Sequence, residues 1–382
     1  EREMVKYQQT KLDFAQVAGC MEELGAEELR EMNAGNIRPV YRGIYFSADM
    51  PTLYRINYTS RLLSRVLAPL ATFKCHDTDY LYRKAKEIPW ESLFTVVQTF
   101  AVFAQVSNSK ITHSRFAALR LKDAIADHFR QKQGTRPDID RNNPDAWINL
   151  HIENDWATIS LDTSGGALHR RGYRRKRVEA PMQETLAAAI IRLSEWDGSV
   201  PLIDPMCGSG TLLCEALMAY CRIPAGFLRK NFGLRLLPDF DEKEWQTVKM
   251  EADNKVHDLP SGLIRGSDIS KRAIAAAKAN LRNIPGGGKV KLKISGFQYL
   301  SDLENSLVVC NPPYGIRTGE KEHLPTFYKA LGDFLKQRCT GSTAYIYFGD
   351  RQFISHIGLK PSWKIPLTNG ALDGRLIKFE LY

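Results

Sequence analysis

The sequence contains no hydrophobic run that approaches the roughly 20 consecutive apolar residues needed for a membrane-spanning helix. The first residues, EREMVKYQQTKLDF, also lack the apolar stretch of a secretory signal. We therefore expect a soluble, cytoplasmic protein without a membrane partner. The composition, 43% hydrophobic and 25% charged, is typical of a globular chain, and no feature predicts an obligate protein partner.

Paired cysteine motifs are absent as well. The seven cysteines are an odd number, lie far apart and form no CxxC pair, so neither a disulfide framework nor a zinc site is expected. We predict no metal. Cys207, Cys214 and Cys221 recur every seven residues, and we interpret them as small buried hydrophobic residues on one helical face.

Acidic residues are fewer than basic residues in this sequence. The sequence has 53 Lys and Arg against 43 Asp and Glu, which gives a net charge of +10 and favours a polyanionic partner. The positive charge is concentrated in LHRRGYRRKR, where basic side chains can neutralise phosphates and an aromatic ring can stack on a base. The candidate nucleic-acid-binding residues are Arg170, Arg171, Tyr173, Arg174, Arg175, Lys176 and Arg177. A solvated basic linker or a nuclear-type targeting sequence is the alternative.

The length of 382 residues predicts more than one domain. Residues 1–70 and 71–164 are each predicted to form a small α+β unit. The expected helices are 19–32, 51–66 and 114–131, and the expected extended segments are 40–48, 95–107, 148–152 and 156–162. Neither unit concentrates catalytic residue types, so binding is the predicted role of this half.

From residue 165 onward the expected strands alternate with helices, which predicts a mainly parallel α/β sheet covered on both faces. The segment around Asn369–Gly370 predicts a hairpin that adds an antiparallel strand at or near one edge. Residues 221–262 are predicted to be an insertion. The expected strands are 201–205, 263–269, 290–295, 307–313 and 343–348, with helices at 211–220, 270–281 and 326–336.

The first motif, LIDPMCGSGT (202–211), combines an apolar strand, an acid, a glycine-rich turn and the start of a helix. In an open α/β sheet, ligands bind at the carboxyl ends of the strands, and Gly208 and Gly210 would allow close approach of the backbone. The motif lacks the third glycine of a dinucleotide site and the Gly-Lys-Ser/Thr of a P-loop.

The second motif, GSDIS (266–270), places Asp268 at the end of the next strand. A carboxylate in that position can accept hydrogen bonds from both hydroxyls of a ribose. The alternative is that Asp268 only caps the helix that follows.

The third motif, VVCNPPYG (308–315), is a buried strand that runs into Asn311 and Pro312. A heteroaryl amine is a poor nucleophile because its lone pair is delocalised into the ring. If the Asn311 side-chain oxygen and the Pro312 carbonyl accept its two N–H bonds, the nitrogen is oriented for attack and its developing charge is stabilised. Tyr314 is expected to stack on the base, which must leave its helix or loop to reach the site.

In this order, DPMCGSGT, GSDIS and NPPYG resemble the motifs of class I methyltransferases that act on amino groups of nucleic acids. The combination of LHRRGYR with APMQETLAAAII (180–191) is more specific, and resembles the bacterial 23S rRNA guanine-N2 methyltransferase family of the RlmL type. Three earlier segments, DTDYLY, FAVFAQVSNSKITHSRFAALRLKDAIADHF and RPDIDRNNPDAWINLHI, resemble a THUMP RNA-binding domain, preceded by a ferredoxin-like unit. With NGALDG near its end, the resemblance covers nearly the whole chain.

The resemblance implies a ferredoxin-like unit at 1–70, a THUMP domain at 71–164 and, at 165–382, a Rossmann-like methyltransferase domain with a mainly parallel seven-stranded sheet. It also implies that the cofactor is S-adenosylmethionine and that the partner is RNA. The implied reaction is methyl transfer to the exocyclic N2 of a guanine in 23S rRNA.

The resemblance further implies roles for single residues. The cofactor would be held by Asp204, Cys207, Gly208 and Gly210, its ribose by Asp268 and its methionine end would lie near Glu184. The target amine would be held by Asn311, Pro312 and Tyr314. Relatives often place an acid after the third strand to bind the adenine amine, but this chain has Phe297 in that segment, and we expect its ring to pack on the adenine.

Three alternatives remain at this point. A tRNA guanine-N2 methyltransferase also combines THUMP with NPPY. Adenine-N6 methylation of DNA suits the same tetrapeptide, although a THUMP-like half favours RNA. A catalytically silent RNA-binding or assembly factor is the third, because the third-strand acid is missing.

Overall fold

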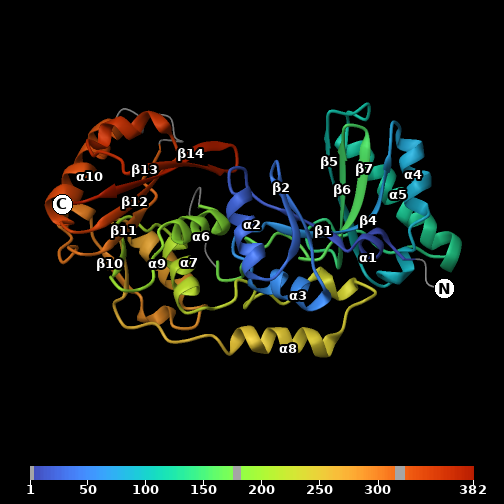
Figure 1. The fold of residues 1–382 in the computed structure, drawn as a ribbon, viewed down its shortest axis with the longest axis horizontal. Coiled ribbons are helices and arrows are strands. Elements are labelled where there is room, and N and C mark those ends of the chain that lie inside the picture. Colours follow the sequence, from blue (N-terminus) through green and yellow to red (C-terminus); the bar gives the residue numbers. More distant parts are fainter. Residues whose placement is uncertain (1–3, 175–181, 315–322) are drawn as a thin grey trace. The chain divides into compact units, whose positions relative to one another are not determined.

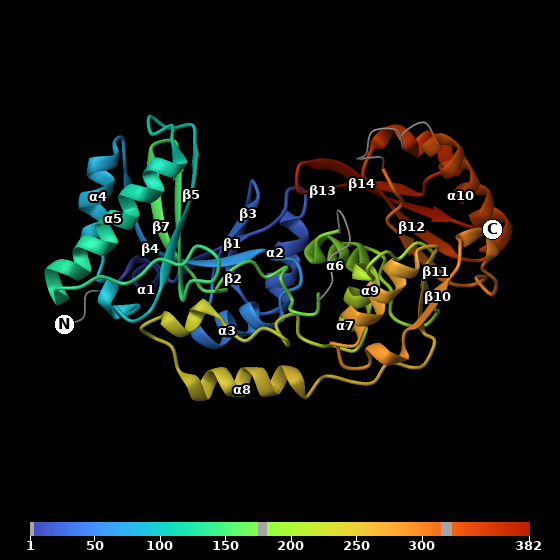
Figure 2. The same cartoon turned by 180° about the vertical axis from the view of Figure 1, so that it is seen from behind.

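The computed structural model describes residues 4–174, 182–314 and 323–382 and contains two compact units (Figures 1 and 2). Unit 1 comprises Glu1–Val17, Gly25–Leu168 and Arg229–Met250, and unit 2 comprises Ala18–Leu24, His169–Leu228 and Glu251–Tyr382. The division differs from a single boundary at residue 165 in two places, because Arg229–Met250 belongs to unit 1 and Ala18–Leu24 to unit 2.

One continuous seven-stranded sheet runs through unit 1, in the order β2-β3-β1-β4-β7-β6-β5. All neighbouring strands are antiparallel except β5 and β6. The strands are β1 (Leu12–Gln16), β2 (Gly35–Val40), β3 (Gly43–Ser47), β4 (Arg65–Lys74), β5 (Phe100–Ser107), β6 (Ala146–Glu153) and β7 (Trp156–Asp162). The two α+β regions expected from the sequence therefore share one sheet.

Strand β4 joins the two regions because it is long enough to have a different partner at each end. Its first residues, Arg65–Leu67, pair with β1, and Leu67–Lys74 pair with β7. The sequence prediction of a helix over 51–66 was too long: helix α3 ends at Thr59, and the hydrophobic segment from Arg65 is extended. Asp49 caps the start of α3 by accepting a hydrogen bond from the Thr52 N–H at 2.9 Å.

The helices of unit 1 leave one face of the β5–β6 region uncovered. Helices α4 and α5 lie on one side of β4–β7 (Figures 1 and 2). On β6, Ile148 and Leu150 are buried while His151 is exposed, and on β5 Phe103 is exposed. The helices that lie wholly within unit 1 are α1 (Lys6–Thr10), α3 (Met50–Thr59), α4 (Thr78–Lys86) and α5 (Ser114–Gln133), and α2 (Glu22–Glu31) lies mostly within it.

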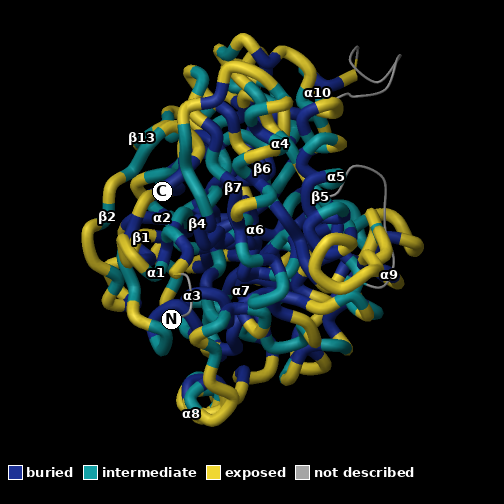
Figure 3. Tube along the Cα trace, turned by 90° about the vertical axis from the view of Figure 1, so that its right-hand side faces the viewer, coloured by how far each residue is buried: buried dark blue, intermediate teal, exposed yellow. Residues whose placement is uncertain are grey.

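Part of the predicted insertion packs within unit 1. Helix α8 (Glu242–Asp253) is exposed over most of its surface (Figure 3) but buries Trp245. The Trp245 ring lies 5.8 Å from the ring of Tyr54, 5.7 Å from that of Tyr58 and 5.2 Å from that of Phe232. The Asp241 N–H also donates a hydrogen bond to the Tyr54 hydroxyl at 2.8 Å. An aromatic cluster therefore holds this segment to α3.

Unit 2 has the expected mainly parallel seven-stranded sheet, in the order β10-β9-β8-β11-β12-β14-β13. Its strands are β8 (Leu202–Asp204), β9 (Ile264–Asp268), β10 (Lys291–Ile294), β11 (Leu307–Cys310), β12 (Thr343–Phe348), β13 (Trp363–Asn369) and β14 (Leu372–Glu380). The predicted C-terminal hairpin is confirmed: Asn369 pairs with Leu372, and Gly370 at φ 62° makes the turn. The antiparallel strand β13 lies at the edge of the sheet.

Helices cover both faces of this sheet. Helices α6 (Glu184–Leu193), α7 (Thr211–Tyr220) and α9 (Lys271–Leu281) lie on one side, and α10 (Leu324–Arg338) lies on the other (Figures 1 and 2). The core under α10 is aromatic, because the ring of Tyr328 stacks against those of Phe348 and Phe353, with centroids 5.3 Å and 5.2 Å away. None of the helices in the described residues is both long and apolar enough to cross a membrane.

Replacing Trp245 with Ala should destabilise unit 1 by about 3–5 kcal/mol, the usual loss for a large aromatic side chain removed from a core. The measurement is the free energy of unfolding from urea titration followed by circular dichroism. Met250→Ala on the same helix is the control, because Met250 is 58% exposed, and its effect should stay within about 0.5 kcal/mol. Equal effects of the two substitutions would show that the aromatic cluster does not anchor α8.

Candidate active site

Three of the predicted site residues follow adjacent parallel strands. Strand β8 lies between β9 and β11, with Asp204 opposite Gly266 and Ile203 opposite Val308. Asp204 and Asp268 are the last residues of β8 and β9, and Asn311 follows the last residue of β11. Since carboxyl ends of parallel strands meet at one edge of a sheet, these three residues occupy the same edge.

The two glycines of the turn after β8 serve different purposes. Both have positive φ, 54° for Gly208 and 80° for Gly210. A Cβ at Gly208 would meet no atom within 4 Å, so the space above the turn is open. A Cβ at Gly210 would lie 3.1 Å from the Ala277 Cβ, so this glycine lets α7 approach α9 closely. Gly208 thus borders an open cradle, and Gly210 supports it.

Asp268 fixes this turn to the end of β9. One carboxylate oxygen accepts a hydrogen bond from the Gly208 N–H at 3.0 Å, and the other accepts one from the Ser270 N–H at 2.8 Å. The cap of α9 is Ser270, whose hydroxyl accepts a hydrogen bond from the Ala273 N–H at 3.2 Å. Asp268 therefore does more than cap a helix, and it is half-buried at the mouth of the cradle.

The first acid of the site is enclosed. Asp204 is 2% exposed and accepts a hydrogen bond from the Met206 N–H at 3.1 Å. Burial raises the pKa of its carboxyl to about 8, and the nearby charge of Asp268 shifts it in the same direction. The neighbouring Cys207 thiol is also buried, which raises its pKa well above the ordinary value and makes it a poor nucleophile.

The side-chain oxygen of Asn311 is buried and has no hydrogen-bond partner within the described residues. A buried acceptor left without a donor costs about 1–3 kcal/mol, so such a group is usually satisfied by something that binds. Pro312 is buried beside it, and as a proline it has no N–H that could donate to the Asn311 oxygen. The arrangement is an acceptor site that lacks its donor.

The turn after Asn311 is held by aromatic residues. The Tyr328 hydroxyl donates a hydrogen bond to the Pro313 carbonyl at 3.1 Å. The half-buried ring of Tyr314 lies over Gly349, where a Cβ would be only 2.7 Å from the ring. Partial burial raises the pKa of the Tyr314 hydroxyl, so it is uncharged at neutral pH. Gly349 therefore leaves the space that Tyr314 fills.

Two of the residues predicted to bind RNA in the basic segment are buried. Arg171 and Tyr173 are each 1% exposed, and both bind the fully buried Glu215 on α7, at 3.4 Å and 3.0 Å. Because they are buried, these two side chains cannot contact RNA in this structure. The pattern of basic residues did not reveal that an acid lies opposite them in the core. Arg170 is exposed, and Arg175, Lys176 and Arg177 lie outside the described residues.

Arg174 belongs to the glycine turn. Its guanidinium pairs with Glu184 at 2.9 Å and donates hydrogen bonds to the Ser209 and Thr211 hydroxyls at 3.3 Å and 3.0 Å. Ser209 and Thr211 flank Gly210, so the ion pair braces the start of α7. In this structure Arg174 therefore braces the glycine turn through Glu184. The RNA contact predicted for Arg174 and the place of Glu184 near the methionine end of the cofactor stay predictions.

Phe297 is not available to an adenine ring. It is 5% exposed and packs edge-on against Phe327 and Phe334, with ring centroids 5.7 Å and 5.2 Å away. Two strongly exposed apolar groups at this end of the sheet are Ile269 and Tyr299, 77% and 80% exposed. Both lie within 4 Å of the position that a Cβ on Gly296 would take. Sequence reasoning missed them, although Ile269 directly follows Asp268.

This topology, with a glycine cradle, an acid at each of two strand ends and an Asn-Pro-Pro-Tyr turn, defines a class I methyltransferase. Comparison with known protein families supports this class. Residues 171–378 match the model of the RMKL-like methyltransferase domain, residues 75–162 match the THUMP domain, and residues 14–67 match the RlmL ferredoxin-like domain. The chain belongs to the RMKL-like methyltransferase family.

Individual relatives cover nearly all of the chain. The protein slr0064 of Synechocystis sp., provisionally named an RNA methyltransferase, is 39% identical over 98% of this chain and 97% of its own length. The ribosomal RNA large subunit methyltransferase K/L of Syntrophotalea carbinolica is 40% identical over 96% of this chain, which spans only about half, 53%, of that relative. The crystal structure of SMU.472 complexed with SAH is 28% identical, with a TM-score of 0.85, and covers 97% of this chain and 98% of its own.

The cofactor of this enzyme is S-adenosylmethionine, whose demethylated product SAH is bound in the SMU.472 structure. The residues of unit 2 fit such a group, because the space above Gly208 is open and a carboxylate, that of Asp268, stands at its mouth. When bound, the cofactor supplies a methyl group on a sulfonium centre.

The pH dependence of stability should reveal the buried carboxyl. Because the pKa of Asp204 is raised from 3.8 to about 8, the folded state holds an extra proton between about pH 4 and 8. Its contribution to the free energy of unfolding therefore falls as pH rises, by about 1.4 kcal/mol per pH unit, and levels off above pH 8. In urea titrations of the cofactor-free protein, stability should therefore fall more steeply between about pH 4 and 8 than it does in Asp204→Asn, and the difference between the two slopes is this contribution.

Asp258→Asn is the matched control, since the Asp258 side chain is 93% exposed and its loss should leave the slope unchanged. Equal slopes in the unaltered protein and in Asp204→Asn would mean that this carboxyl is ionised in the folded protein.

Proposed function

We propose that this methyltransferase transfers the methyl group of S-adenosylmethionine to the exocyclic N2 of a guanine in 23S rRNA. The observation that supports this most directly is the buried, unpartnered side-chain oxygen of Asn311 beside Pro312, at the strand end next to the glycine cradle. An exocyclic amine brings two N–H donors, and this site offers an amide oxygen and a peptide carbonyl.

In this proposal the protein acts by orienting the amine and stabilising its charge, without a strong base. The Asn311 oxygen and the Pro312 carbonyl accept the two N–H bonds, which directs the nitrogen lone pair out of the base plane toward the cradle. As the nitrogen becomes positive, both acceptors stabilise it more strongly. No ionised thiol takes part, because burial raises the pKa of both Cys207 and Cys310 well above the ordinary range.

Three observations favour RNA as the polymer. Residues 75–162 match the THUMP domain, the net charge is +10, and relatives are named as RNA methyltransferases. The large-subunit rRNA assignment follows the names of the K/L relatives from Syntrophotalea carbinolica and Photobacterium profundum. One solved structure with 26% identity and a TM-score of 0.84 is titled an N6-adenine-specific DNA methylase, which keeps adenine as the second candidate base.

Nucleoside analysis identifies the base and the polymer. We expect the protein, incubated with methyl-labelled S-adenosylmethionine and unmodified 23S rRNA, to yield label in N2-methylguanosine. Label only in N6-methyladenosine would refute the guanine assignment, and label only in tRNA in a competition assay would refute the rRNA assignment. A protein that transfers no label and binds no SAH by calorimetry would be an assembly factor rather than an enzyme.

Two substitutions should separate chemistry from cofactor binding. Asn311→Ala should lower the rate of methyl transfer about 100-fold or more, because one acceptor for the amine is lost, while SAH affinity changes little. Asp268→Ala should weaken SAH binding, since it removes the carboxylate at the mouth of the cradle and the anchor of Gly208. Calorimetry and single-turnover kinetics measure the two effects, and the reverse pattern would contradict the assigned roles.

A further inference from the structure

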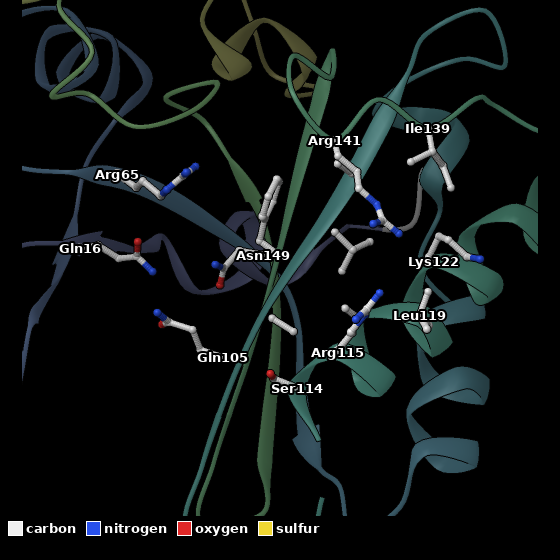
Figure 4. A pocket seen from close by; sticks show the side chains of 15 residues that line it. Gln16, Arg65, Gln105, Ser114, Arg115, Leu119, Lys122, Ile139, Arg141 and Asn149 are labelled. Atoms are coloured by element: carbon white, nitrogen blue, oxygen red, sulfur yellow. The ribbon is translucent and has the colours of Figure 1, made fainter. Parts of the chain in front are cut away.

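Unit 1 contains a pocket that none of the sequence motifs predicted. It has a volume of about 510 Å³ and lies around strand β5, with Arg65, Gln16 and Asn149 on one side of the strand and residues of α5 on the other (Figure 4). Four of the residues that line the pocket are cationic, namely Arg65, Arg115, Lys122 and Arg141, and no lining residue is acidic. This volume is within the range of sites that bind small ligands and suits one nucleotide-sized group.

Two of these cations have no acidic partner in the described part of the chain. On α5, Arg120 pairs with Asp79 at 2.6 Å and Arg130 pairs with Asp127 at 3.0 Å, whereas the exposed Arg115 pairs with no carboxylate. Arg141, from the loop that precedes β6, is equally without one. Figure 4 shows Arg115 and Arg141 extending from the helix and from the loop into the same part of the pocket. Two uncompensated guanidinium groups that converge favour an anion between them.

An aromatic platform lies on the other side of β5. The Phe103 ring is 37% exposed and stacks on the Trp147 ring, with centroids 4.9 Å apart and planes inclined by 17°. The Arg65 guanidinium lies over Trp147, 5.1 Å from its centroid, and is fixed there by an ion pair with the buried Asp162. The same guanidinium lies 5.9 Å from the centroid of the Phe103 ring, so its ion pair with Asp162 holds a rigid, neutralised neighbour beside the partly exposed Phe103 ring.

The strand between these two features is at the edge of the sheet. Strand β5 pairs along its length only with β6. Within the described residues, its one other backbone pairing is an isolated β-bridge between Phe100 and Ile139. Backbone N–H and C=O groups beyond Phe100 therefore face the pocket without strand partners and can bind polar groups of a ligand.

We propose that this pocket binds an unpaired stretch of RNA, with a phosphate between Arg115 and Arg141 and a base stacked on Phe103. The proposal rests on the proposed function only in taking RNA as the polymer, and it adds that the bound segment is single-stranded. A duplex keeps its base faces covered by neighbouring base pairs, so only an unpaired base can lie on Phe103. Positive charge joined to an aromatic platform is the combination that binds single strands without strict sequence preference.

The test is fluorescence anisotropy with a labelled single-stranded oligoribonucleotide of about ten nucleotides and with the same strand in a duplex, in the absence of cofactor. The full chain should bind the single strand more tightly. The double variant Arg115→Ala/Arg141→Ala should lower the magnitude of the slope of log K against log salt by about 0.7, because one phosphate contact is lost. Phe103→Ala should weaken binding roughly five- to 150-fold, the range for one base–aromatic stack.

Arg130→Ala is the matched control, because Arg130 lies on the same helix, is paired with Asp127 and does not line the pocket. Unchanged RNA affinity in the double variant and in Phe103→Ala would overturn the proposal, as would equal or tighter binding of the duplex. Displacement of the RNA by a polyglutamate peptide that depends on Arg115 but not on Phe103 would instead assign the pocket to an acidic peptide. Because the assay involves no methyl transfer, it can succeed when the guanine assignment fails, and the reverse.

Discussion

The methyltransferase site depends on the hydrogen bond between the Asp268 carboxylate and the Gly208 N–H. It ties a flexible glycine turn to the end of the neighbouring strand, and it leaves the space above Gly208 open. Without it, the turn after β8 would be held on the strand side mainly by the Cys207 N–H, which donates to the Ser267 carbonyl at 2.8 Å. On the helix side, the ion pair of Arg174 and Glu184 completes the frame through Ser209 and Thr211. A preorganised cradle of this kind loses little entropy when a ligand enters it.

Much of unit 2 could be predicted from sequence because its signals are local. Short apolar strands alternating with helices, with an acid or Asn-Pro-Pro-Tyr at the strand ends, indicate a mainly parallel sheet and the edge at which these residues meet. The basic segment could not be interpreted in this way, because Arg171 and Tyr173 are buried by a contact with Glu215, more than 40 residues later in the chain. A run of arginines looks the same in sequence whether it faces solvent or a buried carboxylate. The same limit applies to Phe297, whose aromatic neighbours come from α10.

Unit 1 was harder to predict, since its organisation depends on pairing between distant strands. The two α+β regions were recognisable, but their union through β4 depends on contacts of Arg65–Leu67 with β1 and of Leu67–Lys74 with β7. The insertion was located by its composition, but its packing on α3 depends on contacts that the sequence does not reveal, namely the ring contacts of Trp245 and the hydrogen bond from Asp241 to Tyr54. The pocket around β5 combines residues from four strands, one helix and a loop, so no single stretch of sequence marks it.

The shared strand β4 limits how the chain can be divided. Cutting at residue 70, between the two regions that the sequence distinguishes, would split β4. The part that stays with β1 would lose its β7 partners from Leu67 to Pro69, and Ser160–Asp162 of β7 would lose theirs, so each fragment would have an unprotected hydrogen-bonding edge. Exposed edges of that kind recruit strands from other molecules, so each fragment would be prone to aggregate. The ferredoxin-like and THUMP segments therefore share one folding unit, and a truncated protein should retain both or neither.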